Sequence, residues 1–211
     1  LASGIAGVTL SHALSPEALT AWGWRIAFLV GAVIVPFGLM LRRSLGETLH
    51  LAEPDPHAPR TLPVRVIALS IVILGAATIC NYTITYISTY AQSVLAMPST
   101  IAFGATVTHG LTMTLCAMLG GVLADRFGAP PVMIAPLIVL ALIAAPAFHF
   151  LEQTRTSAAL YGVVALLGAL QSTAVAACYA GVTGSLPKHT RSAALAIIYA
   201  VSVSIFGGSA Q

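Results

Sequence analysis

Long stretches of this chain carry no charged side chain. Asp, Glu, Lys and Arg are absent from 66–124, 127–151, 156–187 and 192–211, and the few charges fall in short clusters between these stretches. A charge at the centre of a membrane helix costs about 2.5–3.5 kcal/mol on insertion scales. The pattern therefore predicts an all-α integral membrane protein whose charge clusters are its loops.

The lengths of the apolar segments predict where the chain crosses the bilayer, since a spanning helix needs roughly 20 residues. We expect the end of one span at 1–10, complete spans at 24–41, 66–92, 101–123, 131–150 and 157–185, and the start of another at 192–211. Between them we expect a polar loop at 11–23, a Pro-rich segment at 42–65, a turn at 93–100, and short loops at 124–130, 151–156 and 186–191. The chain lacks an initiator Met, and no basic region precedes the first apolar run, so we interpret it as a fragment without a signal peptide.

The basic residues are distributed unequally when successive loops are assigned alternately to the two sides of the membrane. One side carries seven of them and the other only two, Arg25 and Arg155; the seven are Arg42, Arg43, Arg60, Arg65, Arg126, Lys188 and Arg191. By the positive-inside rule the first side is cytoplasmic. Loops 42–65, 124–130 and 186–191 are therefore expected in the cytoplasm.

Composition excludes several classes of protein. Hydrophobic residues make up 58% of the chain and charged residues 7%, against roughly 25% charged residues in soluble domains. Nine basic residues scattered over loops form no patch that could follow a nucleic acid. Cys80, Cys116 and Cys178 lie in spans without CxxC spacing, so we expect neither a metal site nor a cofactor.

Three of the complete spans carry polar residues near their middles, and two do not. The spans at 24–41 and 131–150 can face lipid all round, whereas polar groups in the other three must pair internally or line a wet cavity. These groups are Asn81, Tyr82, Thr85, Tyr86 and Ser88 in one span, Thr106, Thr108, His109 and Thr112 in the next, and Gln171, Ser172, Thr173 and Tyr179 in the last. The pattern predicts a helical bundle around a central cavity with two peripheral helices.

Asn81, Thr85 and Tyr82 are candidate cavity residues on one helix. Asn81 and Thr85 share a face at helical spacing, and Tyr82 lies beside them. The alternative is polar packing between helices, worth roughly 0.6–2 kcal/mol per contact. Gln171 and Tyr199 fall near midplane depth and are further candidates for contact with a ligand.

His109 is the only Asp, Glu, Lys, Arg or His near the middle of a complete span. Because an unperturbed imidazole has a pKa of about 6.5, such a residue can exchange a proton at physiological pH. The functional hypothesis is that His109 is a sixth cavity residue and serves in proton coupling or carboxylate binding. The alternative is a neutral histidine bonded to Thr106 or to a backbone carbonyl.

Three motifs carry a family resemblance. The segment 120–128, Gly-Gly-Val-Leu-Ala-Asp-Arg-Phe-Gly, resembles the loop signature between two helices of the major facilitator superfamily, although Ala129 and Pro130 stand where further basic residues are usual. Segments 22–28 and 41–48 look like the sixth helix and its cytoplasmic end in the metabolite:proton symporter family of that superfamily. The segment 186–191, followed by Tyr199 and 206–208, is similar to the start of that family's eleventh helix.

The loop signature implies a cytoplasmic gate. Gly121 would permit close helix approach, and Gly128 would adopt positive φ in a short turn. Asp125, Arg126 and Arg191 would form a charge cluster that stabilises one gate state. The alternative is unrelated anchors, for which a surface ion pair is worth about 0–1 kcal/mol.

The resemblance implies a major-facilitator-type bundle covering the end of helix five to helix eleven of twelve. Residues 1–41 would end the N-terminal bundle, 42–65 would be the central cytoplasmic loop, and 66–211 would form the C-terminal bundle. The run 81–90 looks closest to citrate and tricarballylate symporters. Shikimate, α-ketoglutarate and proline or betaine stay open as substrates, and a channel or an intramembrane protease stays open as another class.

The implied activity is proton-driven symport of a small organic acid, which would proceed by alternating access of the two halves. The expected partners are that anion, a proton, the lipid bilayer and the missing N-terminal half, in a monomeric transporter of the inner membrane that binds no nucleic acid. A trianion needs countercharge, and this chain offers none at midplane beyond a protonated His109. Either the missing half supplies an Arg or Lys, or the substrate is less charged than citrate.

Overall fold

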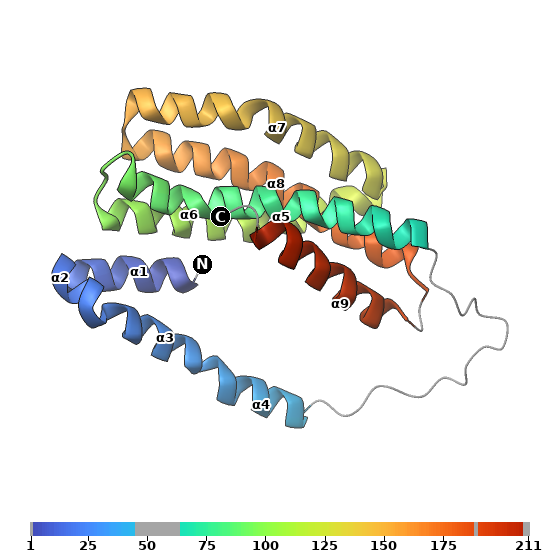
Figure 1. Cartoon of the computed structure of the whole chain (residues 1–211), viewed down its shortest axis with the longest axis horizontal. Coiled ribbons are helices and arrows are strands. Elements are labelled where there is room, and N and C mark those ends of the chain that lie inside the picture. Colours follow the sequence, from blue (N-terminus) through green and yellow to red (C-terminus); the bar gives the residue numbers. More distant parts are fainter. Residues whose placement is uncertain (1, 45–63, 188–189, 209–211) are drawn as a thin grey trace.

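The computed structural model describes residues 2–44, 64–187 and 190–208, which form helices joined by short connections (Figure 1). The predicted loop 42–65 lies largely outside the described residues, as do Lys188 and His189 and the last three residues of the chain. The elements are α1 (Ala2–Ala13), α2 (Pro16–Ala18), the π-helical η1 (Leu19–Gly23), α3 (Trp24–Ala32), α4 (Ile34–Ser44), α5 (Val64–Ser93), α6 (Ser99–Phe127), α7 (Ala129–Thr154), α8 (Ser157–Ser185), α9 (Arg191–Ser202) and the π-helical η2 (Val203–Gly207).

The five complete spans predicted from the sequence are confirmed as helices. Five helical stretches are long and apolar enough to cross a membrane, and they are Ala21–Ser44, Val64–Ser93, Ser99–Phe127, Ala129–Thr154 and Ser157–Ser185. Their ends alternate between the two ends of the bundle: the start of α5 and the α6–α7 and α8–α9 junctions gather at one end (Figure 1). The α5–α6 and α7–α8 junctions lie at the other, which we call the outer end because it carries few basic residues.

Three predicted loops are wrong in extent. The segment 11–23 is helical over most of its length in α1, α2 and η1, Asp125 and Arg126 lie in the last turn of α6, and α7 continues to Thr154. A polar residue marks the depth at which the chain leaves the bilayer, not the end of the helix, because continued helix still satisfies backbone groups at the surface. Gly128 is the one residue between α6 and α7, and its φ of 87° confirms the predicted positive φ.

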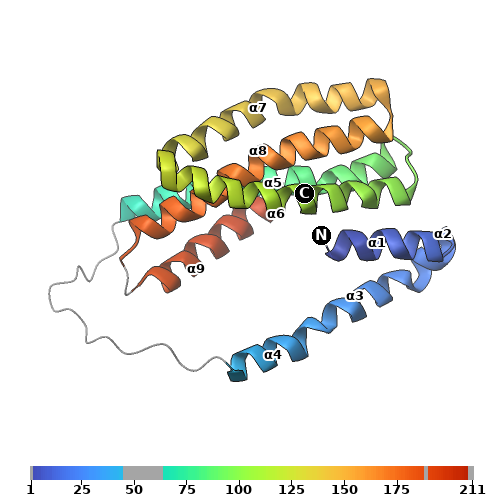
Figure 2. The ribbon, with the colours of Figure 1, turned by 180° about the vertical axis from the view of Figure 1, so that it is seen from behind.

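α8 is the central helix of the bundle and packs against α5, α6, α7 and α9 (Figures 1 and 2). Apolar side chains along its length, including Leu160 and Leu167, are fully buried. The expectation that the segment 131–150 faces lipid all round is wrong for one face of α7. Leu140 of α7 is buried in the same core as Leu160 and Leu167. Van der Waals contact drives this helix association, since no hydrophobic effect acts between helices within lipid.

The α6–α8 contact depends on a glycine one position away from the predicted one. A Cβ at Gly120 would lie 2.6 Å from the Thr173 carbonyl oxygen and 2.8 Å from its Cα, so the two backbones meet there. A Cβ at Gly121 would meet nothing within 4 Å. The assignment of close approach to Gly121 is therefore wrong, because one residue turns a helix by 100° and points Gly121 away from α8.

α1 packs on the outer half of α6, whereas α3 and α4 lead away from the bundle (Figure 2). The contact is close: a Cβ at Gly4 would lie 2.8 Å from the Val107 nitrogen. Apolar side chains of α3 and α4 are exposed, with Phe28 at 74%, as expected of a lipid-facing helix. The predicted span 24–41 is interrupted at Val33, one turn before Pro36, since proline removes a backbone donor from the helix.

Candidate functional site

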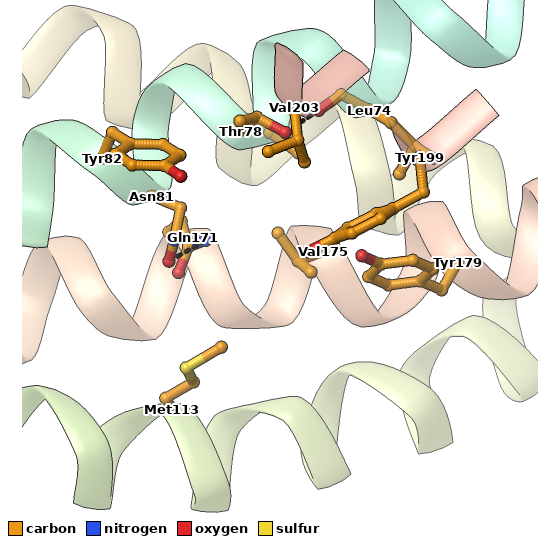
Figure 3. A pocket seen from close by; sticks show the side chains of 11 residues that line it. Leu74, Thr78, Asn81, Tyr82, Met113, Gln171, Val175, Tyr179, Tyr199 and Val203 are labelled. Carbon is orange, nitrogen blue, oxygen red and sulfur yellow. Dashed lines mark hydrogen bonds between the residues drawn. The ribbon is translucent and has the colours of Figure 1, made fainter. Parts of the chain in front are cut away.

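A cavity of about 190 Å³ lies at mid-depth between α5, α8 and the α9–η2 segment (Figure 3). α5 contributes residues one turn apart, α8 contributes a parallel row, and α6 closes one side. The lining residues are Leu74, Ala77, Thr78, Asn81, Tyr82, Met113, Gln171, Val175, Tyr179, Tyr199 and Val203. None of these eleven side chains is charged.

Helical spacing explains how the lining is assembled. Leu74, Thr78 and Tyr82 follow one another at intervals of four residues on α5, and such residues share a helix face. On α8, Gln171, Val175 and Tyr179 repeat the same interval. The cavity is therefore a space between two facing stripes.

Hydrogen bonds hold part of the polar lining in place. Thr78 donates its hydroxyl to the Leu74 carbonyl at 2.7 Å, so that hydroxyl is used within its own helix. Gln171 Nε2 donates to Asn81 Oδ1 at 3.4 Å and joins α8 to α5 at one wall of the cavity (Figure 3). Gln171 is 1% exposed, so its amide belongs to the cavity wall.

Three tyrosines supply further polar groups to the lining. The hydroxyl groups of Tyr82 and Tyr179 point into the space between α5 and α8, and Tyr199 lies beside Tyr179 (Figure 3). Each phenol can donate one hydrogen bond, and each ring offers a π-face. The cavity can therefore bind hydrogen-bond acceptors, and its rings can contact an organic cation.

Four of the six predicted cavity residues line this cavity, namely Asn81, Tyr82, Gln171 and Tyr199. Thr85 does not; it is exposed and donates to the Asn81 carbonyl at 2.8 Å. The sequence prediction omitted Thr78 and Tyr179 from the site. Thr78 lies four residues before Tyr82 and Tyr179 lies eight residues after Gln171, and this helical spacing is the signal that could have identified them.

His109 lies outside the cavity lining, in the α6–α8 contact. Its Cδ2 atom would be 3.0 Å from a Cβ at Gly168, so the ring rests against the α8 backbone. His109 is four residues before Met113, and Gly168 is three before Gln171, which places the ring one helical turn to the outer side of the cavity. Its Nε2 atom is buried with no hydrogen-bond partner among the described residues, so the predicted bond to Thr106 or a carbonyl is not made at that atom.

The predicted gate charges form no ion pair with one another among the described residues. The Arg191 guanidinium donates to the Leu186 carbonyl through Nη2 at 3.2 Å, and the Arg126 guanidinium lies 5.4 Å from the centre of the Phe127 ring. Within residues 2–44, 64–187 and 190–208, no ion pair joins Asp125 to either arginine. Arg191 acts here on the carboxyl end of α8, where a cation is favourable.

No group of three His, Cys, Asp or Glu able to hold a metal ion occurs in the described part of the chain. All three cysteines are free, and Cys178 is buried. The polar groups of the cavity are amides and hydroxyls, which bind through hydrogen bonds. The arrangement suits reversible binding of a small polar molecule.

Comparison with known proteins shows similarity to one protein family along nearly the whole chain. A family model described as Major Facilitator Superfamily matches residues 1–208. A citrate-proton symporter of Klebsiella pneumoniae is 30% identical over 96% of this chain and 47% of its own length. An alpha-ketoglutarate permease of Escherichia coli (strain K12) is 30% identical over 97% of this chain and 49% of its own length.

A further relative, a putative proline/betaine transporter of Staphylococcus haemolyticus (strain JCSC1435), is 31% identical over 99% of this chain and 47% of its own length. The chain therefore spans about half the length of these curated relatives. No solved structure matches the chain significantly.

Proposed function

This chain belongs to the major facilitator superfamily, and from that premise we propose that the full-length protein is a proton-coupled symporter of a small organic acid, citrate or a related tricarboxylate. It is a multi-pass protein of the inner membrane, with five described helices able to cross a bilayer. The relatives named as a citrate-proton symporter and an alpha-ketoglutarate permease support an organic acid as substrate. Residues 1–41 and 66–211 would belong to the two halves that rock against each other.

The cavity between α5 and α8 carries the proposal. Its phenols and amides can donate hydrogen bonds to carboxylate and hydroxyl oxygens, and a buried amide joins the two helices at its wall. At about 190 Å³ it is smaller than the roughly 300–1,000 Å³ of small-molecule pockets. The other half of the transporter would complete the site.

His109 is the proposed proton-coupling residue. A buried polar atom without a partner is uncommon in native proteins and calls for an explanation. An imidazolium at this place would be a buried charge facing no carboxylate of the described chain, so protonation would favour a different packing of α6 against α8. That difference is what coupling of a proton to alternating access requires.

A second candidate substrate is a zwitterion such as proline or betaine. The described cavity has no Lys or Arg to neutralise a trianion, and three tyrosine rings line it. A ring face attracts an ammonium group at roughly 0.5–2 kcal/mol. The relative named as a putative proline/betaine transporter has similar identity to this chain.

The test is uptake by the full-length protein in proteoliposomes with an imposed proton gradient. Citrate, tricarballylate, α-ketoglutarate, shikimate, proline and betaine are offered separately as labelled substrates. We expect accumulation of citrate or tricarballylate that collapses when a protonophore dissipates the gradient. Accumulation of betaine or proline alone would replace the first candidate by the second.

Counterflow separates a transporter from a channel. Substrate loaded on the far side should accelerate entry of labelled substrate, because alternating access returns the loaded site faster than the empty one. A pore shows no such acceleration. Entry that is indifferent to substrate on the far side would contradict the proposal.

Asp125→Asn is expected to slow transport about fivefold, the effect of losing an ion pair worth about 1 kcal/mol. We propose that Gly121, Asp125, Arg126, Gly128 and Arg191 form a cytoplasmic gate. Since Asp125 pairs with neither arginine in the described structure, its pair would form in the opposite state of the cycle. Initial uptake rates measure the effect, Asp125→Glu is the matched control, and an unchanged rate in Asp125→Asn argues against the gate.

A further inference from the structure

An amide pair joins the two helices that form the cavity. Gln171 of α8 donates from Nε2 to Oδ1 of Asn81 on α5 at 3.4 Å, over a sequence separation of 90 residues. Gln171 is almost fully buried, at 1% exposure, while Asn81 is half-buried and lines the cavity. Figure 3 shows the two side chains meeting across the gap between the helices.

The structure shows which way the Gln171 amide faces. Ser172 lies next to it and places its hydroxyl oxygen 3.5 Å from Gln171 Oε1. The same hydroxyl donates at 2.6 Å to the Gly168 carbonyl, which anchors Ser172 on α8. The single hydroxyl hydrogen of Ser172 is directed mainly to Gly168, so its contact with Oε1 is the weaker one. The bond from Nε2 to Asn81 Oδ1 gives the orientation: Nε2 faces Asn81, and Oε1 lies on the Ser172 side.

The bond to Gln171 fixes the orientation of Asn81 in turn. Asn81 Oδ1 accepts from Gln171, so the Nδ2 group is on the other side of the same amide. Nδ2 makes no hydrogen bond to the described residues, and Asn81 lines the cavity. Two N–H donors are therefore available to a ligand at this point.

We infer that Gln171 is a positioning residue that holds Asn81 with its N–H donors toward the cavity, so that this subsite takes a carboxylate oxygen of the substrate. The inference rests on the proposed function and makes it more specific. A carboxylate is common to citrate, α-ketoglutarate, proline and betaine, so the subsite serves each candidate substrate. An ammonium group is disfavoured at this subsite, because the Asn81 Nδ2 group presents donors to the ligand and an ammonium needs an acceptor.

Two substitutions separate the donor from the residue that orients it. Asn81→Asp keeps an acceptor for Gln171 but removes the donors and adds a charge that repels carboxylate. Gln171→Glu offers Asn81 an acceptor only, so the Asn81 amide turns its Nδ2 toward residue 171 and its Oδ1 toward the cavity. We expect each to raise KM about tenfold or more, because a hydrogen bond to a charged group is lost.

The measurement is KM and the maximal rate of uptake by the full-length protein in proteoliposomes, with whichever carboxylate substrate the wild type accumulates. The maximal rate should change much less than KM. Gln153→Glu is the matched control, since it makes the same chemical change on the exposed outer end of α7. Equal KM values in wild type and in both cavity variants overturn the inference.

A double-mutant cycle tests the amide pair without any transport. Melting temperatures of the full-length protein are compared for wild type, Asn81→Ala, Gln171→Ala and the double variant. The two shifts should fail to add, because residues in one hydrogen-bonded network are coupled. If the two shifts in melting temperature simply add, the hydrogen bond between Asn81 and Gln171 is contradicted. If the shifts are coupled but no tested carboxylate is transported, the proposed function fails while the pair stands.

Discussion

His109→Gln is expected to abolish proton-driven accumulation of substrate while membrane insertion stays intact. Glutamine retains a polar group of similar reach but takes up no proton at physiological pH. The ring of His109 lies one turn from the cavity against Gly168, and its Nε2 is buried without a partner among the described residues. If protonation there drives the change of state, a side chain that cannot be protonated equilibrates substrate without concentrating it.

The experiment compares accumulation under a proton gradient with counterflow in its absence, for the full-length protein in proteoliposomes. His149→Gln is the matched control because that histidine is exposed at the outer end of α7, with its side chain 70% accessible. The control should accumulate substrate normally. Full accumulation by His109→Gln would remove His109 from the coupling mechanism.

Gly120→Ala is expected to destabilise the full-length protein by about 1–3 kcal/mol, the cost of forcing extra volume into a packed contact. The added methyl group would lie 2.6 Å from the Thr173 carbonyl oxygen. Backbone atoms cannot move aside as a flexible side chain does, so α6 and α8 must separate. Since α8 is the central helix and carries Gln171, the change should also disturb the cavity.

Gly121→Ala is a close control, because it makes the same substitution one position along the same helix. Both variants gain similar helix propensity, up to about 1 kcal/mol, so their difference isolates the clash. A Cβ at 121 meets nothing within 4 Å, and the melting temperature of that variant should not fall. Equal melting temperatures for the two variants would contradict the packing of α6 on α8.

The segment 120–128 shows which features of a helix junction can be predicted from the sequence and which cannot. Its two glycines, its charges and its final glycine predict a tight junction between helices, and Gly128 has the expected positive φ. Which of the two adjacent glycines touches α8 depends on the rotation of α6 about its axis. That rotation is set by packing along the whole helix, and no local pattern reveals it.

His109 shows the same limit within the site. Its isolation in an uncharged stretch identified it as a functional candidate, but its depth alone suggested a place in the cavity. The structure puts Met113, one turn further along, into the lining and leaves His109 against Gly168. Depth follows from the count of residues along a helix, whereas the partner of a side chain depends on how neighbouring helices are turned.

The sequence by itself determined that this chain is a multi-pass helical membrane protein, where its complete spans lie, and which spans carry polar groups. The free-energy cost of placing a charge in a bilayer is large and applies to each residue separately. The positions of the charged residues in the sequence therefore predict the spans directly. Only the tertiary structure decided that Asn81 meets Gln171 and that Gly120 rather than Gly121 lies against α8. Those contacts join residues far apart in the chain, and they arise from helix packing, whose small individual energies leave no local signature.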